Sequence, residues 1–317
     1  MHEPLGTATL TDGAELALQV VAGPDAQWAP VLGGLLGHKG PVYLGHIRDA
    51  LREPLDALHT LYYLGTVAGA PVTVAVVAGA HGAGILAHVY TVPAWRRRGA
   101  SSALFRALAR DVRARGFRVL TLGTNPEGHA RRLYEGMGFR QLVPGGGDMR
   151  WEAFPGAHLP DGPPQTGPLR WDDWGWISAA AAAPLATGED VPRSRWLGVD
   201  GPAHVEAGFL AARQERRPLQ VLRRGAAVIG WAGLSEREAA ACGRVSALDF
   251  YVRPEYASDA ADVDALLAAV PWPERPVLCA LGGPAGYKAD ALRRHGFSPS
   301  PPLPALQGLT LWVRPAP

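Results

Sequence analysis

The chain has 317 residues, of which 47% are hydrophobic and 19% are charged, and its formal net charge at pH 7 is +2. This composition is typical of a folded globular protein and excludes a disordered one. A net charge so close to zero creates no overall field that would attract nucleic acid or an anionic membrane, so we expect neither as a partner.

The sequence carries no targeting or metal-binding signal. The N-terminus has no charged segment followed by an apolar run, and no apolar stretch is long enough to span a bilayer. We therefore predict a cytoplasmic protein. Cys242 and Cys279 lie in apolar segments, where two buried thiols are the expectation and a disulfide between neighbouring strands is the alternative. No spacing typical of metal ligands occurs, so no metal is expected.

Two units of ordinary domain size are predicted, because residues 154–168 (FPGAHLPDGPPQTGP) are rich in proline and glycine and lack any periodicity. This stretch is interpreted as a linker between a first domain, residues 1–153, and a second domain, residues 169–317.

The first domain shows alternating strand and helix patterns. The predicted strands are 16–21, 60–67, 72–77, 85–92, 117–122, 139–143 and 148–153. The predicted helices are 25–37, 42–53, 100–115 and 127–137. In the third of these helices, Ala103, Leu104, Ala107, Leu108 and Val112 share one face, which is the pattern of a helix packed on a sheet. Gly116 is expected to end that helix.

The second domain repeats parts of the first. The segment LDFYVRPEY at 248–256 resembles HVYTVPAW at 88–95, and ALRRHGF at 291–297 resembles LYEGMGF at 133–139. We infer an internal duplication. The repeat differs in its polar residues, because Ala257, Ala260 and Asp262 stand where the first copy has Arg96, Gly99 and Ser101. A carboxylate at this point repels a phosphate, so the second copy is predicted to be degenerate.

The most informative segment is TVPAWRRRGASSAL at 91–104, in which a strand ends in an arginine- and glycine-rich turn that opens a helix. Free backbone N–H groups and the positive end of the helix dipole favour a phosphate or pyrophosphate there. Together with ARRLYEGMGF at 130–139, this segment resembles the GNAT superfamily of acyl-CoA-dependent N-acyltransferases. The other interpretation of the arginines is a basic surface turn before an ordinary helix.

The resemblance implies an α/β fold with a mixed α+β sheet, present here as two GNAT-like domains in tandem. It also implies that the loop binds the pyrophosphate of acetyl-CoA, as acyl donor, and that the strand before it splays from its neighbour and binds pantetheine. Gly99 is then needed because a Cβ there would push the ligand away. The residues predicted to bind this cosubstrate are Thr91, Val92, Arg96, Arg97, Arg98, Gly99, Ala100, Ser101, Ser102, Asn125 and Tyr134.

Tyr134 and His88 are the predicted catalytic residues. The resemblance implies that Tyr134 protonates the leaving thiolate; its other interpretation is a half-buried aromatic that packs the helix on the sheet. A base is needed for an alkyl amine, because an amine with a pKa near 10.4 costs about 4.6 kcal/mol to deprotonate at pH 7. His88 lies on the strand that would line the cleft, where a core histidine is the alternative, and Glu127 and Glu135 are further candidates.

The function implied by the resemblance is N-acetyltransfer from acetyl-CoA to a primary amine of a small molecule or peptide. The alternative is a non-catalytic module that binds CoA or a partner protein. A nucleic-acid-binding role for the three arginines lacks a wider basic stripe to support it. We expect a monomer or a homodimer. Aromatic residues of the first two helices and nearby strands, either acceptor pocket or core, are Trp28, His38, Tyr43, His46, Tyr62 and Tyr63.

Overall fold

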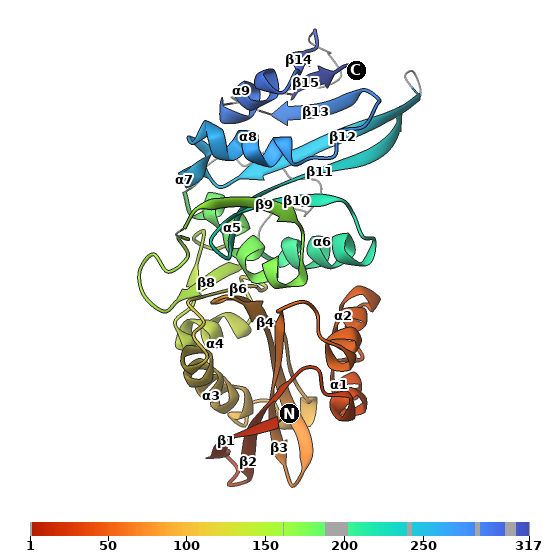
Figure 1. Cartoon of the computed structure of the whole chain (residues 1–317). Helices are drawn as coiled ribbons and strands as arrows, with labels where there is room; N and C mark the ends of the chain where they lie inside the picture. The colour runs from red at the N-terminus through yellow and green to blue at the C-terminus, as the bar shows by residue number, and fades with distance from the viewer. Residues whose placement is uncertain are drawn as a thin grey trace.

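The computed structural model describes residues 2–160, 162–187, 202–239, 243–282, 286–301 and 309–316. These residues form two mixed sheets, one from each half of the chain. Figure 1 shows the two sheets one above the other, with helices α5 (Trp174–Thr187) and α6 (Pro202–Gln214) between them. The fold is therefore a mixed α/β fold with two separate sheets, as the sequence predicts.

The first sheet has the order β1-β2-β3-β4-β5-β6-β8-β7. Its strands are β1 (His2–Thr9), β2 (Glu15–Ala22), β3 (His59–Val67), β4 (Ala70–Ala80), β5 (Ala83–Thr91), β6 (Val119–Gly123), β7 (Arg140–Gln141) and β8 (Asp148–Glu152). All neighbouring strands are antiparallel except β5 and β6, which are parallel and joined by helix α3 (Ala100–Ala114).

Helices cover both faces of the first sheet. They are the short helix η1 (Ala26–Trp28), α1 (Ala29–Leu36), α2 (Pro41–Arg52), the short helix η2 (Pro93–Trp95), α3 (Ala100–Ala114) and α4 (Ala130–Met137). Helices α1 and α2 share a core with one face of the sheet, and α3 and α4 share a core with the other. The five residues predicted to form the inner face of α3 are all buried, and Gly116 follows the helix with φ +79°.

The second sheet repeats the strand order of the first. Its strands are β9 (Pro164–Pro168), β10 (Leu219–Arg224), β11 (Ala227–Ala239), β12 (Gly243–Val252), β13 (Val277–Gly282), β14 (Ser298–Pro299) and β15 (Leu309–Arg314). The order β9-β10-β11-β12-β13-β15-β14 follows β2-β3-β4-β5-β6-β8-β7, with one parallel pair at the same place. The tandem arrangement inferred from the repeat is therefore present in the strand topology.

The helices of the second half divide between its two faces. They are the short helix η3 (Trp171–Asp173), α5 (Trp174–Thr187), α6 (Pro202–Gln214), α7 (Pro254–Ala257), α8 (Ala260–Ala268) and α9 (Gly286–Arg294). Residues of α7, α8 and α9 share one core with the outer face of the second sheet. Residues of α5 and α6 share a core with the inner faces of both sheets.

Helix α5 is the centre of the molecule. Its residues 174–183 (WGWISAAAAA) are all buried, as expected for a helix that is apolar all round. It contacts β4, β5 and β6 of the first sheet and β11 of the second. At Gly175, an added Cβ would lie 2.3 Å from the carbonyl oxygen of Ala83, so the backbones of α5 and β5 are in close contact.

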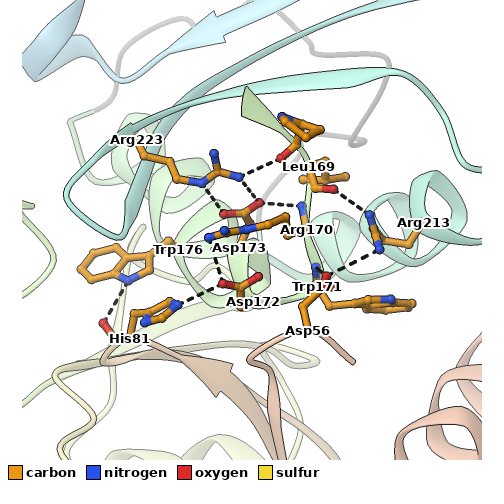
Figure 2. A network of polar contacts seen from close by, with 11 residues as sticks. Asp56, His81, Leu169, Arg170, Trp171, Asp172, Asp173, Trp176, Arg213 and Arg223 are labelled. Carbon is orange, nitrogen blue, oxygen red and sulfur yellow. Dashed lines mark hydrogen bonds and ion pairs between the residues drawn. The ribbon is translucent and has the colours of Figure 1, made fainter. Parts of the chain in front are cut away.

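A buried ion pair fixes the start of this helix. The guanidinium of Arg223 on β10 donates two hydrogen bonds of 2.7 Å to the two carboxylate oxygens of Asp173 (Figure 2). Asp173 also accepts a 2.7 Å hydrogen bond from the backbone N–H of Arg170. Bidentate geometry together with a third donor offsets the desolvation of this buried charge.

A second set of contacts joins this point to the first sheet (Figure 2). Asp172 lies 3.0 Å from Nε2 of His81, in the turn between β4 and β5, and the indole of Trp176 donates to the His81 carbonyl at 3.1 Å. The backbone N–H of Trp171 donates to Asp56 at 2.7 Å. The two halves are thus joined by polar contacts at the edge of an apolar core.

The predicted helix 25–37 is divided into η1 and α1, and the predicted strand 117–122 begins only at Val119. Four further differences are larger. Strand β1 is not among the predicted strands. The predicted strand 139–143 is reduced to Arg140–Gln141, and the predicted helix 127–137 begins at Ala130. At the end of the predicted linker 154–168, Pro164–Pro168 form β9, because their backbone pairs with β10. Residues before β9 also contact the second half, since the carbonyl of His158 accepts a hydrogen bond from Arg253 at 2.8 Å.

Cys279 lies buried on β13, whereas Cys242 lies outside the described residues, so the pairing of the two cysteines stays a prediction. In the part of the chain that the structure describes, no helix is long and apolar enough to cross a membrane. The same residues contain no group of three histidine, cysteine or acidic side chains that could hold a metal ion.

Gly175→Ala tests the close contact of α5 with β5. Because the new Cβ would overlap the backbone of Ala83, we expect the free energy of unfolding to fall by about 1–3 kcal/mol. Gly33, in α1, has open space around it, so Gly33→Ala is the matched control and should be neutral or stabilising by about 0.5–1 kcal/mol. Urea denaturation followed by tryptophan fluorescence measures both. Equal stability of the two variants would contradict the packing described here.

His46 on α2 predicts a loss of stability in acid. It is buried against Trp171 and Trp174, with ring centroids 5.6 and 4.8 Å away. Burial lowers the pKa of His46 from 6.5 to about 3. The unfolded chain therefore binds a proton below pH 6.5 that the folded chain refuses, so stability is present above pH 6.5 and is lost as the pH falls toward 3. We expect His46 to cost about 2 kcal/mol of unfolding free energy at pH 5 relative to pH 7.5.

His46→Phe keeps the aromatic contact and removes the titrating group. The difference in unfolding free energy between pH 7.5 and pH 5 should shrink by that amount, measured by urea denaturation at both pH values. An unchanged difference would show that folding does not lower the pKa of His46.

Candidate active site

The ladder between β5 and β6 ends early. Ala83–Ile85 pair with Val119–Thr121, and the pairing stops there although β5 continues to Thr91. On its other edge, β5 stays paired with β4 as far as Thr91. The two strands are therefore unpaired beyond Ile85 and Thr121, which is the splay that the family resemblance implies, and this unpaired stretch is called the β5–β6 opening.

A β-bulge places His88 beside this opening. The register of β4 against β5 shifts between Val74 and Val76, and His88 has φ +52°. The extra residue turns the His88 side chain toward α2, where its ring centroid is 5.4 Å from that of Tyr43. Burial, helped by the positive charges of Lys39 and His38, lowers the pKa of His88 from 6.5 to about 4. His88 is therefore neutral at pH 7 and is a weak proton acceptor.

The loop from β5 to α3 leaves the start of the helix open. Gly99 immediately precedes α3 with φ +87°, and its carbonyl accepts the first helical hydrogen bond from Ala103 at 2.9 Å. Gly99 is exposed, and a Cβ there would come no closer than 4.0 Å to its nearest neighbour, Thr11. Ala100 is buried below the loop. The N–H groups of the first turn lack acceptors within the helix and the space around Gly99 is open, so an anion site here stays a prediction.

The three arginines of the loop occupy different positions. Arg96 donates from Nε to the carbonyl of Thr91 at 3.0 Å. Arg98 donates to Asp12 at 2.5 Å and lies over the ring of Trp95. Arg97 is exposed and has φ +60°. Arg96 and Arg98 therefore brace the loop, whereas Arg97 is directed to solvent.

A chain of hydroxyls ties the end of β5 to the start of α3. The Thr91 hydroxyl lies 2.7 Å from that of Ser101 and 2.8 Å from that of Thr73. Val92 donates its N–H to the carbonyl of Val72 at 2.9 Å. Ser101 therefore contributes a hydroxyl contact that holds the loop in place.

A basic groove continues from this loop between α3 and α4. It has a volume of about 700 Å³ and begins at Ser102. Its charged and ionisable lining residues are Arg106, Arg110, Arg113, His129 and Arg132. The helical periodicity places the first three arginines opposite the core, but it does not reveal that Arg132 of α4 faces them.

Tyr134 lies on the α3–α4 side of the sheet. It is 7% exposed, and its ring packs against Phe105 and Phe139 with centroids 5.6 and 6.2 Å away. Burial raises the pKa of Tyr134 to about 12, so the hydroxyl keeps its proton at neutral pH. The residue thus combines the packing role and the protonated state that an acid requires.

The polar residues before and within α4 are directed outward. Asn125 is exposed, and its side-chain oxygen accepts a 3.0 Å hydrogen bond from the N–H of Glu127. Glu127 is exposed, and Glu135 forms an exposed ion pair with Arg131 at 3.1 Å. The structure does not bring these carboxylates to His88 or the β5–β6 opening.

The aromatic residues proposed for an acceptor pocket separate into two groups. Tyr62 and Tyr63 are fully buried, and their hydroxyls donate to the Ile47 carbonyl at 3.2 Å and to Asp111 at 2.8 Å, so they belong to the core.

The other aromatic residues lie nearer to β5 or to the N-terminus. The ring centroid of His38 is 4.5 Å from that of Tyr90, and Tyr43 faces His88. His46 is core, and Trp28 packs on His2.

One acidic residue of this region was not predicted. Oε1 of Glu206, on α6, lies 3.4 Å from Nε2 of His88. Burial raises the pKa of Glu206 from 4.5 to about 7. Glu206 belongs to the half that the sequence marks as degenerate, 118 residues after His88, so no local pattern indicates this contact.

The matching cleft of the second half is filled by its own side chains. Asp262, which replaces Ser101, is buried and accepts hydrogen bonds from Arg224 at 2.7 and 3.2 Å. The Tyr287 hydroxyl lies 3.0 Å from the N–H and 3.1 Å from the carbonyl of Val252, at the end of β12. The degenerate character predicted from the sequence thus has a structural counterpart.

Comparisons with known proteins concern the first half. Residues 63–144 match the family model of FR47-like proteins, which is related to the GNAT superfamily. No curated protein sequence matches the chain.

Three solved structures resemble one half of the chain. The GNAT domain of S. lividans PAT is 15% identical, with 46% of this chain and 96% of that chain covered and a TM-score of 0.37. YncA, a putative acetyltransferase from Salmonella typhimurium with its cofactor acetyl-CoA, is 13% identical, with 49% of this chain and 94% of that chain covered and a TM-score of 0.37. A phosphinothricin acetyltransferase from Sinorhizobium meliloti in complex with acetyl-CoA is 17% identical, with 48% of this chain and 88% of that chain covered and a TM-score of 0.37.

The family model covers β3 to the loop after β7, which includes the splayed strand, the arginine loop and α4. The first half of the chain therefore has a GNAT-type fold, and the two sheets form a tandem arrangement of that fold.

Proposed function

We propose that this protein is an N-acetyltransferase that transfers an acetyl group from acetyl-CoA to a primary amine of a small molecule or peptide. The observation that carries the proposal is the exposed start of α3 at Gly99, next to the opening between β5 and β6. An exposed helix start beside two diverging strands suits a ligand that is anionic at one end and extended at the other.

The start of α3 would hold the pyrophosphate. The N–H groups of Ala100, Ser101 and Ser102 have no acceptor within the helix, and the helix dipole adds positive potential there. The arginines of the α3–α4 groove would attract the third phosphate of acetyl-CoA, on the ribose of its adenosine. Arg97 is the loop arginine that is exposed for a direct contact.

The splayed part of β5 would bind the pantetheine arm through its backbone. The carbonyl of Thr91 and the N–H of Val92 already bond to Arg96 and Val72. The amide contacts are therefore expected on residues between Ile85 and Thr91, where the ladder with β6 has ended. Thr91 and Val92 then shape the cleft, and Asn125 contributes through the turn that precedes α4.

Tyr134 would act as the acid for the departing thiolate. Its hydroxyl is protonated at pH 7, because burial raises its pKa to about 12. A thiol has an ordinary pKa of about 8.5, so the thiolate is a fair leaving group and the acid contributes only modestly. Attack by the amine on the thioester carbonyl is direct in this proposal, without an acyl-enzyme.

The test is acetyl-CoA binding to the full-length protein by calorimetry, followed by a screen of primary amines for thiol release. Micromolar binding with amine-dependent thiol release supports the acetyltransferase. Binding without release for any amine would favour the alternative of a non-catalytic CoA-binding module. Absence of binding by the folded protein would rule out both.

Gly99→Trp is predicted to abolish acetyl-CoA binding. The indole would occupy the open space in front of α3, and the positive φ of Gly99 disfavours any side chain. Gly145→Trp is the matched control, because Gly145 is also exposed, has φ +77° and has nothing within 4 Å. Calorimetry should show at least about a 100-fold weaker Kd for Gly99→Trp alone. Normal binding by this variant would mean that the loop is not the pyrophosphate site.

Tyr134→Phe is predicted to keep acetyl-CoA binding and to lower kcat. Phenylalanine preserves the packing on Phe105 and Phe139 and removes only the hydroxyl. Because the thiolate leaves readily, the loss should lie near or below the about 100-fold that marks the lower range of general acids. Thiol release under saturating substrates measures kcat, and a fully active variant would exclude the acid role.

A further inference from the structure

The second half of the chain places a carboxylate against the first sheet. Nε2 of His88 and Oε1 of Glu206 face each other at 3.4 Å, and the two side chains are 6% and 14% exposed. Neither atom has a hydrogen-bond partner among the residues that the structure describes. Buried polar atoms normally have one. The 3.4 Å contact lacks hydrogen-bond geometry, so each atom keeps hydrogen-bonding capacity for a polar group that approaches from beside the pair.

Helix α6 holds Glu206 in this position by contacts spaced along one face. Phe209, three residues on, stacks on Trp174 with ring centroids 5.3 Å apart. Arg213, one turn further, lies 3.6 Å from Asp56 of the first half. Gln214 donates to the carbonyl of Val42 on α2 at 3.3 Å. Glu206 is thus presented by a helix that is docked on the first half.

The location matches the far side of the proposed acetyl-CoA cleft. His88 lies on the segment of β5 beyond its ladder with β6. Thr121, the last residue of β6 that pairs with β5, has its hydroxyl 2.6 Å from that of Ser178 on α5. Helices α2, α5 and α6 therefore line this side of the opening, whereas Tyr134 packs on the α3–α4 side.

We propose that Glu206, supplied by the second half, binds the amino group of the acceptor in the first half and accepts its proton. This inference rests on the proposed acetyl transfer and identifies the acceptor as a cationic primary amine. The carboxylate pairs with an ammonium group, the neutral imidazole of His88 accepts a hydrogen bond from it, and the Tyr43 ring adds a surface that attracts cations.

Acetyl transfer removes two protons from the ammonium nitrogen, one before and one after the new bond forms. One N–H proton of the ammonium passes to the Glu206 carboxylate, and the freed nitrogen lone pair forms a bond to the thioester carbonyl carbon. The C–S bond breaks, and its electron pair stays on sulfur, which takes a proton from Tyr134. The amide nitrogen releases its extra proton to water, solvent restores the Tyr134 hydroxyl, and Glu206 finally loses its proton to water.

The charges around Glu206 set the pH at which it works. Burial raises the pKa of Glu206 to about 7, and the positive charge of Lys39 opposes this shift. The other titratable groups on this side are His88 on β5, His38 before α2, and Tyr43 and His46 on α2. Only ionised Glu206 binds an ammonium and accepts a proton, so kcat/KM should rise as the pH increases through about 7.

The experiment compares full-length wild type with Glu206→Gln and Glu215→Gln. Glutamine keeps the shape of residue 206 and removes its charge. Glu215 follows the same helix but is exposed and paired with Arg217, so its variant is the matched control. Benzylamine, with phenethylamine as a second probe, is titrated by NMR at pH 8. We expect Glu206→Gln to weaken amine binding by at least about tenfold, with Glu215→Gln unchanged.

Turnover gives a second readout. Glu206→Gln should lower kcat/KM by about 100-fold or more and remove the rise of kcat/KM near pH 7. Acetyl-CoA binding should stay intact. Glu206→Asp, which restores a carboxylate, should recover part of the activity. Equal amine binding by wild type and Glu206→Gln, or no binding of either probe by wild type, would overturn the inference. If acetyl-CoA does not bind while the amines still distinguish the variants, the acetyltransferase proposal fails and the amine site stands.

Discussion

The burial of α5 between the two sheets is the constraint on which the rest of the structure depends. A helix with no polar face can be stable only if both sides are covered, so the two sheets must stay together. The Asp173–Arg223 pair fixes where this helix begins, because removing either partner would leave an uncompensated buried charge. Once α5 is fixed, α6 follows through the stacking of Phe209 on Trp174, and α6 carries Glu206.

The two halves show how one topology can hold an open and a closed cleft. Both sheets have a single parallel pair that ends early, so both have the backbone divergence. In the first half, the exposed Gly99 leaves space at the helix start. In the second half, the Asp262–Arg224 pair takes the place of an anion, and Tyr287 occupies the backbone groups of Val252. Side chains, not strand order, thus decide which half can bind a ligand.

The sequence predicts the local features well, because helix faces, glycine turns and the loop at 91–104 depend on neighbours in the chain. The early end of the β5–β6 ladder confirms the splay that the family resemblance implies, whereas the loss of function in the second copy stays a prediction. Strand β1 is missed, since most of its side chains alternate only between exposed and half-buried positions. The position of α5 cannot be predicted, because an apolar helix does not indicate which sheets it contacts. Glu206 is missed for the same reason, because it lies on α6 of the second half and its partner His88 lies on β5 of the first sheet.

The junction also explains why the predicted linker separates sheets rather than cores. Ala83, Ile85 and Val119 of the first sheet share one core with Val221 and Trp231 of the second, through α5. A chain cut after residue 153 would expose this face of the first sheet to water. The buried titratable groups gathered there, His46, His88 and Glu206, reduce stability at one pH or another, since each resists its charged form. Groups that are unfavourable for folding are typical of sites that are retained for binding or chemistry. A second half that has closed its own cleft still shapes the first, because it covers one face of its sheet and brings a carboxylate to His88.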